Sequence, residues 1–254
     1  MPAPPRLFVD PPLVAGTSLV LPPGAARHVQ VLRLQPGDAL TLFDGRGGEA
    51  SASVLKIGRA DVTLQVGERV EVDRELPFAV TLALGMPANE RMDALVEKAT
   101  ELGAAAIQPL VCARSVLRLA GERADKRLAH WRAVAVSACE QSGRTRLPVL
   151  QPVRPLVDWL AGLASPRPGE APPRRWLLSL GVADDDLAAA PALGADTLVL
   201  SGPEGGLDAN EEALAIGCGF RRLSLGPRVL RADTAPLAFL VALAWQARRP
   251  AAAA

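Results

Sequence analysis

The sequence of 254 residues has few cysteines, two histidines and no tyrosine. Its cysteines, Cys112, Cys139 and Cys218, are far apart, odd in number and flanked by apolar residues. This usage argues against a disulfide framework and a zinc site, and it favours a reducing, cytoplasmic location. His28 and His130 have no Cys or carboxylate partner at ligand spacing, so we expect neither a metal site nor a Ser-His-Asp arrangement.

Long apolar runs are also lacking. No stretch of about 18 apolar residues occurs, so no transmembrane helix is predicted. The opening Met1-Pro-Ala-Pro-Pro lacks the basic region and apolar stretch that are typical of a secretory signal. Because 49% of the residues are hydrophobic and the mean hydropathy is +0.19, the chain has enough apolar material for a sizeable core.

The net charge is only +1, so neither acidic nor basic residues predominate in the chain as a whole. Basic residues are nevertheless concentrated in two segments. Between Arg114 and Arg154, nine Lys or Arg residues stand against three acidic ones, and from Arg221 to Arg231 there are four arginines and no acid. Such patches attract phosphate even on a neutral chain, although a solvated helix surface explains them equally well.

Residues 1–75 are expected to form a small β-barrel or sandwich, because apolar and polar side chains alternate between Pro-Gly, Asp-Gly and Gly-Gly turns. One short helix fits at Ala25–Leu34. The motif Gly45-Arg-Gly-Gly-Glu-Ala50 matches a loose dinucleotide pattern, which requires a helix directly after it. Since Ser51–Ile57 alternates like a strand, we interpret the motif as a hairpin turn. The expected strands are Thr17–Leu21, Ala39–Phe43, Ala50–Ile57 and Asp61–Val66.

Residues 76–254 alternate strands with amphipathic helices, which indicates a mostly parallel sheet covered on both faces. The Pro-rich segment Ser165–Pro173 is expected to be a loop and residues 248–254 a frayed tail. The expected strands are Phe78–Leu84, Ala105–Val111, Val149–Val153, Trp176–Leu180, Thr197–Leu200 and Arg222–Leu225, and the expected helices are Asn89–Leu102, Asp125–Ser142, Leu156–Leu163, Ala209–Ile216 and Ala235–Gln246.

The loop Ser201-Gly-Pro-Glu-Gly-Gly-Leu-Asp208 joins a buried strand to a helix. Asp208 and Glu211 have the spacing of a capping box, with a carboxylate in place of the hydroxyl. No Gly-Lys-Ser/Thr follows, so a nucleotide-triphosphate loop is excluded. An ordinary strand-to-helix turn is the alternative, but three glycines and a proline around one glutamate favour ligand binding.

A second loop, Leu225-Gly-Pro-Arg-Val-Leu-Arg-Ala-Asp-Thr234, also leaves a strand and enters a helix. In a parallel sheet such strand ends meet at the carboxyl edge, where ligands bind, so the two loops predict one pocket. Leu225, Val229 and Leu230 are candidates for packing an adenine. Thr234 is expected to cap the following helix.

A third candidate lies at the end of the long helix, where Ser137, Glu140, Gln141 and Arg144 form one polar stripe. The stripe runs into Gly143 and a basic segment. Contact with RNA and a solvated helix face are both compatible with it.

Six segments, taken together, resemble the SPOUT methyltransferases, specifically the family that methylates N3 of a uridine in 16S ribosomal RNA. They occur in the same order as in that family and extend over nearly the whole chain. These segments are Arg27–Asp38, Leu42–Gly45, Glu97–Gly103, Cys139–Arg144, Gly202–Gly206 and Leu225–Arg231.

The resemblance implies an N-terminal PUA-like β-barrel that binds RNA in residues 1–75. It also implies a C-terminal α/β domain in residues 76–254, with a parallel sheet and a trefoil knot, an exception to the rule that chains do not thread loops. The implied assembly is a cytoplasmic homodimer that acts on 16S ribosomal RNA of the small ribosomal subunit, without metal or membrane. S-adenosyl-L-methionine is the implied cofactor. Its predicted binding residues are Ser201, Gly202, Pro203, Glu204, Gly205, Leu225, Gly226, Val229 and Leu230.

The predicted chemistry is removal of the uracil N3 proton followed by attack of N3 on the sulfonium methyl group. Arg144 or Arg231 is expected to stabilise the uracil anion, and Glu140 or Glu204 to accept the proton. The predicted catalytic residues are therefore Arg144, Glu140 and Arg231. The predicted RNA-binding residues are Arg27, His28, Arg33, Gln141 and Arg144.

The chain departs from the family at Leu230-Arg-Ala-Asp-Thr234, where the family has Leu-Arg-Thr-Glu-Thr. Ala232 lacks a hydroxyl, and Asp233 is one methylene shorter than glutamate. Because tyrosine is absent, any stacking on the base must come from Phe, Trp or Arg. Two alternatives remain open: a SPOUT methyltransferase acting on a tRNA ribose 2′-hydroxyl, and a ribosome-assembly factor that binds RNA without catalysis.

Overall fold

The computed structural model describes residues 4–59, 61–163, 173–180, 184–186 and 196–247. The expected frayed tail and almost all of the expected Pro-rich loop lie outside these residues. Contacts divide the chain into two units. The first comprises Met1–Glu75 together with Val136–Leu147, and the second comprises Leu76–Ala135 together with Pro148–Ala254. Among the described residues, no helix combines the length and the apolarity that crossing a membrane requires.

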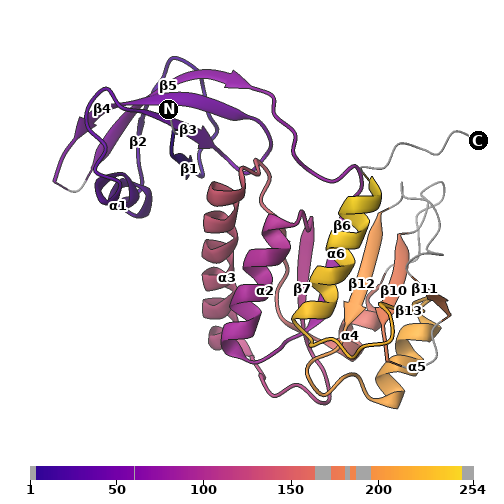
Figure 1. Cartoon of the computed structure of the whole chain (residues 1–254). Coiled ribbons are helices and arrows are strands. Elements are labelled where there is room, and N and C mark those ends of the chain that lie inside the picture. The colour runs from indigo at the N-terminus through magenta and orange to yellow at the C-terminus, as the bar shows by residue number, and fades with distance from the viewer. Residues whose placement is uncertain (1–3, 60, 164–172, 181–183, 187–195, 248–254) are drawn as a thin grey trace, which may run out of the picture. The chain divides into compact units, whose positions relative to one another are not determined.

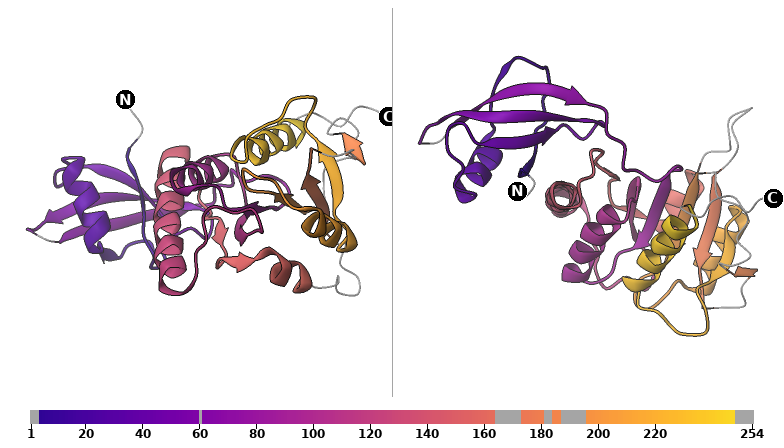
Figure 2. Two further views of the ribbon diagram at one scale, coloured as in Figure 1. Left: turned by 90° about the horizontal axis from the view of Figure 1, so that it is seen from below. Right: turned by 45° about the horizontal axis from the view of Figure 1, so that its top comes forward.

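The first unit contains a five-stranded sheet in the order β1-β3-β4-β5-β2, with the helix α1 (Pro23–Val31) beside it (Figures 1 and 2). Strand β1 is parallel to β3, and the other pairs are antiparallel. The four strands expected from alternation are present, and β1 is an additional one. The strands are β1 (Arg6–Phe8), β2 (Ser18–Val20), β3 (Ala39–Phe43), β4 (Glu49–Ile57) and β5 (Val62–Val70).

Alternation explains why this sheet has a core. Leu40 and Leu42 on β3 and Leu64 on β5 are buried in one apolar cluster, to which α1 adds Ala26 and Val29. The segment that matches a dinucleotide motif leads directly into β4 rather than into a helix. The interpretation of that segment as a hairpin turn is therefore confirmed, and its glycines at positions 45, 47 and 48 all have positive φ.

The second unit contains a parallel sheet in the order β11-β13-β10-β12-β6-β7-β8, with β9 also paired to β7. All of its strand pairs are parallel, as the alternation of strands and helices predicts. The strands are β6 (Val80–Gly85), β7 (Ala106–Val111), β8 (Val149–Leu150), β9 (Arg154–Pro155), β10 (Arg174–Leu178), β11 (Asp185–Asp186), β12 (Thr197–Ser201) and β13 (Arg221–Ser224).

Helices cover both faces of this sheet, as Figures 1 and 2 show. On β6, Leu82 packs in a cluster with residues of α2, α3 and α6, whereas Ala83 packs in a cluster with α4 and α5. Neighbouring side chains thus point to opposite faces, as β-geometry requires. The helices are α2 (Asn89–Glu101), α3 (Gly121–Ser142), α4 (Leu156–Ala161), α5 (Ala209–Gly217) and α6 (Thr234–Ala247).

Two topological features bear on the site. The chain passes from β12 across β10 to reach β13, because β10 lies between them in the sheet. The trefoil knot itself stays a prediction. Helix α3 begins four residues earlier than expected, and its last turns belong to the first unit rather than to the second.

Candidate functional site

Four strands of the second unit end at the same edge of the sheet. Ser201 at the end of β12 is paired with Leu84 of β6 and with Leu178 of β10, and Leu178 is paired with Leu223 of β13. The loops after these strands therefore start side by side. This register confirms that the two glycine-containing loops leave the same carboxyl edge, where α/β proteins bind ligands.

The first loop folds tightly on itself. The amide of Gly206 donates to the carbonyl of Pro203 at 2.8 Å, and Gly206 has a φ of +70°. A side chain at Gly202 would place its Cβ 2.8 Å from the amide nitrogen of Leu207. Glycine at position 202 is thus required by the turn itself, and its predicted contact with the cofactor stays a prediction.

The start of this loop is buried against the sheet. Ser201 and Pro203 are both buried, and Pro203 packs over Gly85 at the end of β6. A Cβ at Gly85 would lie 2.5 Å from Cδ of Pro203, so the loop and β6 are in direct contact.

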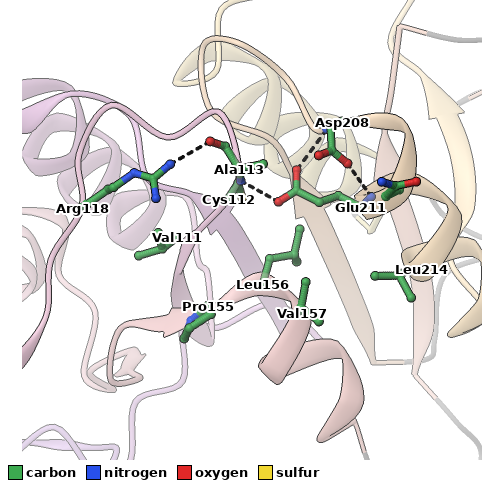
Figure 3. Close-up of a pocket in the computed structure, with 11 residues that line it drawn as sticks. Val111, Cys112, Ala113, Arg118, Pro155, Leu156, Val157, Asp208, Glu211 and Leu214 are labelled. Carbon is green, nitrogen blue, oxygen red and sulfur yellow. Dashed lines mark hydrogen bonds between the residues drawn. The ribbon is translucent and has the colours of Figure 1, made fainter.

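The predicted capping box at the start of α5 is present (Figure 3). Asp208 Oδ1 accepts from the Glu211 amide at 2.8 Å, and Glu211 Oε2 accepts from the Asp208 amide at 3.0 Å. The other oxygen of Glu211 accepts from the amide of Ala113, just after β7, at 2.7 Å. The cap therefore also joins the glycine loop to the loop after β7.

Charged side chains connect the glycine loop to further strand ends. Glu204 Oε1 accepts from the amide of Ala88, after β6, at 3.0 Å and lies 3.4 Å from Nη1 of Arg91. Arg114, after β7, donates from Nη1 to the carbonyls of Gly205 and Leu207 at 3.0 and 3.3 Å.

The second loop is open and apolar. Gly226 has a φ of +103°, and among the described residues, its two chain neighbours apart, no atom lies within 4 Å of the position its Cβ would take. Val229 is 76% exposed, while Leu225 and Leu230 are half-buried and Arg231 is exposed. Free space beside a glycine and an exposed aliphatic side chain suit a ligand with an apolar ring, so these residues fit the predicted adenosine-containing cofactor.

A cavity of about 280 Å³ lies next to the capping box, between the end of β7 and the starts of α4 and α5 (Figure 3). Leu156, Val157 and Leu214 give it an apolar wall. Asp208 and Glu211 line it, but the residues of the second loop do not. It is therefore not the pocket that the two glycine loops were expected to form.

Glu140 belongs to the first unit, where it joins the end of α3 to β1 and α1. Its Oε1 accepts from the Phe8 amide at 3.0 Å, and its Oε2 lies 3.6 Å from Nδ1 of His28. Burial raises the pKa of Glu140, although the Phe8 hydrogen bond and the charges of His28 and Arg6 oppose this rise. A raised pKa suits a proton acceptor, and that role stays a prediction.

Arg144 is also in the first unit and is only 4% exposed. Its guanidinium forms an ion pair with Glu75, with Nε 3.2 Å from Oε1 and a second contact from Nη2 to Oε2. The structure therefore gives Arg144 a structural role as an ion-pair partner. Its predicted contact with substrate stays a prediction, and Arg231, the other candidate cation, belongs to the second unit.

All five predicted RNA-binding residues belong to the first unit. Arg27, Arg33 and Gln141 are exposed, His28 is partly exposed, and Arg144 is buried. Arg33 lies two residues past the end of α1 and is a non-glycine residue with positive φ, at +57°. A residue in this left-handed conformation commonly ends a helix, and the Leu34 amide donates across it to the Val29 carbonyl at 3.3 Å.

Glu75 and Arg114 were not predicted from the sequence as residues of the site. Arg114 follows the buried strand β7 at the carboxyl edge, and that position alone marks it as a candidate. Glu75 carries no such signal, because its partner Arg144 is 69 residues away in the sequence.

Comparison with known proteins shows which family the chain resembles. Residues 74–244 match the family model of the RNA methyltransferase domain, and residues 21–70 match that of the RNA methyltransferase PUA domain. Ribosomal RNA small subunit methyltransferase E from Synechocystis sp. is 33% identical to this chain, over 91% of the chain and 74% of that protein.

Two solved structures resemble the chain nearly from end to end. One is ribosomal RNA small subunit methyltransferase E from Neisseria gonorrhoeae bound to S-adenosyl methionine, with a TM-score of 0.87, 35% identity, and coverage of 94% of this chain and 96% of that one. The other is a putative methyltransferase from Legionella pneumophila in complex with the bound cofactor SAM, with a TM-score of 0.87, 33% identity, and the same coverage.

Proposed function

We propose a function from one premise: the chain belongs to the RNA methyltransferase family, whose domain model it matches over residues 74–244. The resemblance and the α/β fold class with a PUA-like N-terminal part, both predicted from the sequence, are thereby confirmed. The proposed reaction is methylation of N3 of a uridine in 16S ribosomal RNA of the small ribosomal subunit. The observation that carries this proposal is the alignment of four strand ends, which places both glycine-containing loops at one edge.

The proposed cofactor, S-adenosyl-L-methionine, supplies an electrophilic methyl group when bound. Leu225, Val229 and Leu230 would pack against its adenine, and the open side of Gly226 allows close approach of the backbone. Arg231 is exposed on the same loop, where its charge would stabilise a deprotonated uracil. Holding both reactants in register supplies up to about 7–11 kcal/mol of the barrier by avoiding entropy loss.

The first unit is proposed to bind the RNA through Arg27, His28, Arg33 and Gln141. Three of these side chains are exposed, and His28 is partly exposed. We place the reaction in the cytoplasm, because the proposed substrate is a ribosomal subunit.

The proposal is tested with labelled S-adenosyl-L-methionine and small ribosomal subunits from a strain that lacks the modification. Label in N3-methyluridine supports the proposed reaction. Label in a ribose would assign the chain to the 2′-hydroxyl enzymes, and absence of label would favour an RNA-binding assembly factor. Calorimetry with Gly226→Val is the matched binding test, because a branched side chain would strain the backbone at this positive φ and occupy the open side of the second loop. We expect this variant to lose cofactor affinity.

A homodimer is proposed from the surface of α6. This helix buries Phe239, Leu240 and Leu243 yet leaves Val241 51% and Trp245 70% exposed, one turn apart. A helix that is apolar on several sides is typically covered, and a second copy of the chain would cover it. We expect Trp245→Glu to reduce the mass in sedimentation to that of one chain, 26.6 kDa. Val116→Glu, at another exposed apolar residue, is the control.

A further inference from the structure

We propose that Arg114 and Glu204 are positioning residues that hold the Gly202–Asp208 loop in its cofactor-binding shape. Arg114 acts from the loop after β7, and Glu204 acts on the loop after β6. The inference rests on the proposed function, because it assigns this loop to the cofactor. It also changes the role expected for Glu204, which the sequence suggested as a cofactor contact or proton acceptor.

Arg114 binds the outer half of the loop. One nitrogen, Nη1, donates to two carbonyls of the loop, those of Gly205 and Leu207. The backbone is also close, since a Cβ on Gly205 would lie 3.0 Å from Cβ of Arg114. A cation that bridges two carbonyls two residues apart fixes their relative orientation, and hydrogen bonds from a charged donor are stronger than neutral ones.

Glu204 binds in the opposite direction, away from the loop. Its Oε1 accepts from the amide of Ala88, which precedes the first residue of α2, and lies near Arg91 in the first turn of that helix. Alanine has no side-chain oxygen, so α2 begins without a cap from its own N-terminal residue. Glu204 supplies a carboxylate at this helix end, where negative charge is favourable.

The two contacts tie the loop to the two strands that follow on one side of β12. The strand order places β6 next to β12 and β7 next to β6, so Glu204 and Arg114 tie the loop to two successive strand ends. Glu211 adds a third tie, from its carboxylate to Ala113. A glycine-rich loop has more conformational freedom than other sequences, and these ties reduce the freedom that cofactor binding would otherwise remove.

The Arg114 part of the proposal predicts a defect in cofactor binding rather than in chemistry. We expect Arg114→Ala to raise the Kd and KM for S-adenosyl-L-methionine about tenfold or more, with kcat at saturating cofactor nearly unchanged. Arg114→Lys keeps the charge and a donating nitrogen but lacks the planar guanidinium, so it should recover part of the affinity. Arg118→Ala is the matched control, because Arg118 donates to Ala113 within its own loop and does not contact the glycine loop.

The Glu204 contact is tested by two substitutions. Glu204→Gln keeps an oxygen that accepts from Ala88 but loses the charge beside Arg91, so its cofactor Kd should rise less than that of Glu204→Ala. Glu204→Ala removes that oxygen and should raise the cofactor Kd about tenfold. Glu90→Gln, in the first turn of α2, is the control for a charge change at that helix end.

The outcomes distinguish a positioning role from a catalytic one, and both from failure of the proposed function. An Arg114→Ala protein that melts like the parent chain and binds the cofactor with unchanged Kd would overturn the positioning role. A fall of more than about a hundredfold in kcat for Glu204→Gln, with KM unchanged, would instead make Glu204 the proton acceptor. If the parent chain itself fails to bind S-adenosyl-L-methionine in calorimetry, the proposed function fails and this inference with it.

Discussion

Arg144 shows how strongly a single residue is constrained by its surroundings. It is buried against Glu75, and removing one partner of a buried ion pair typically costs about 3–5 kcal/mol because the other charge is left uncompensated. We therefore expect Arg144→Ala to lower the free energy of unfolding by about that amount. The double variant Arg144→Met, Glu75→Leu should recover most of the loss, as measured by urea unfolding.

The same pair of variants separates the structural role of Arg144 from its predicted catalytic role. If methyl transfer returns with stability in the double variant, Arg144 is needed only for folding. If the folded double variant stays more than about tenfold below the parent chain at saturating cofactor, Arg144 also acts on the RNA.

The contributions of Glu140 and Glu49, two carboxylates of the first unit, to the free energy of unfolding are expected to depend on pH in opposite directions. Burial raises the pKa of Glu140, so the folded chain holds that proton more tightly than the unfolded chain does. Its contribution to stability therefore falls as the pH rises from about 4.5, the ordinary value, through the raised folded pKa. We expect the free energy of unfolding of Glu140→Gln to decline less than that of the parent chain between about pH 4 and about pH 7.

The pKa of Glu49 is shifted in the opposite direction. Burial alone would raise its pKa, but hydrogen bonds and charges from Arg74 and Arg6 outweigh burial and lower it. Glu49 therefore stabilises the fold above about pH 4.5, and this contribution is lost as the pH falls through its lowered pKa. The difference in stability between the parent chain and Glu49→Gln should shrink on acidification, and a constant difference would contradict this account.

At the scale of elements, the strands and helices with a clear side-chain period were predictable. Strand β3 was predicted with its exact bounds, and α2 to within one residue. The strands β1, β9 and β11 were not predicted, because two or three residues cannot display a period. They form because their backbones pair with longer neighbours, which is a property of the whole sheet rather than of a local segment.

The side-chain cap at the start of α5 is expected to stabilise the helix. Asp208 accepts from the Glu211 amide, and losing such a cap typically costs about 1 kcal/mol. We expect Asp208→Ala to lower the unfolding free energy by about that amount and to weaken cofactor binding, since α5 directly follows the glycine loop. Asp208→Asn keeps an accepting oxygen and should lose little stability. Equal losses in the two variants would show that charge, not capping, is what matters.

At the scale of the molecule, the sequence predicted where the loops of the site would start but not what holds them. The carboxyl edge followed from the alternation of strands and helices. The partners of Glu204, Arg114 and Arg144 did not, because each contact joins residues more than 60 positions apart. The assignment of Val136–Leu147 to the first unit was missed for the same reason.

That segment makes a prediction about autonomous folding. Residues 1–75 alone lack Glu140, which accepts from the Phe8 amide, and the carbonyl of Gly143, which accepts from Arg74 at 2.9 Å. They also lack Thr145, whose carbonyl accepts from Gly47. We expect the fragment 1–75 to give poorly dispersed amide NMR spectra, and the same fragment joined by a flexible linker to 136–147 to give dispersed ones. A scrambled 136–147 segment is the control, and a well-dispersed spectrum of the short fragment would contradict the prediction.

Within the first unit, α3 presents Glu140 to the Phe8 amide, and the carbonyl of Gly143, just past the helix, accepts from Arg74. An α-helix has 3.6 residues per turn, so one extra residue between Glu140 and Gly143 would turn the second contact by about 100° around the helix axis relative to the first. Insertions and deletions in this stretch should consequently be far rarer among natural variants of the chain than in its surface loops, even where side chains vary freely.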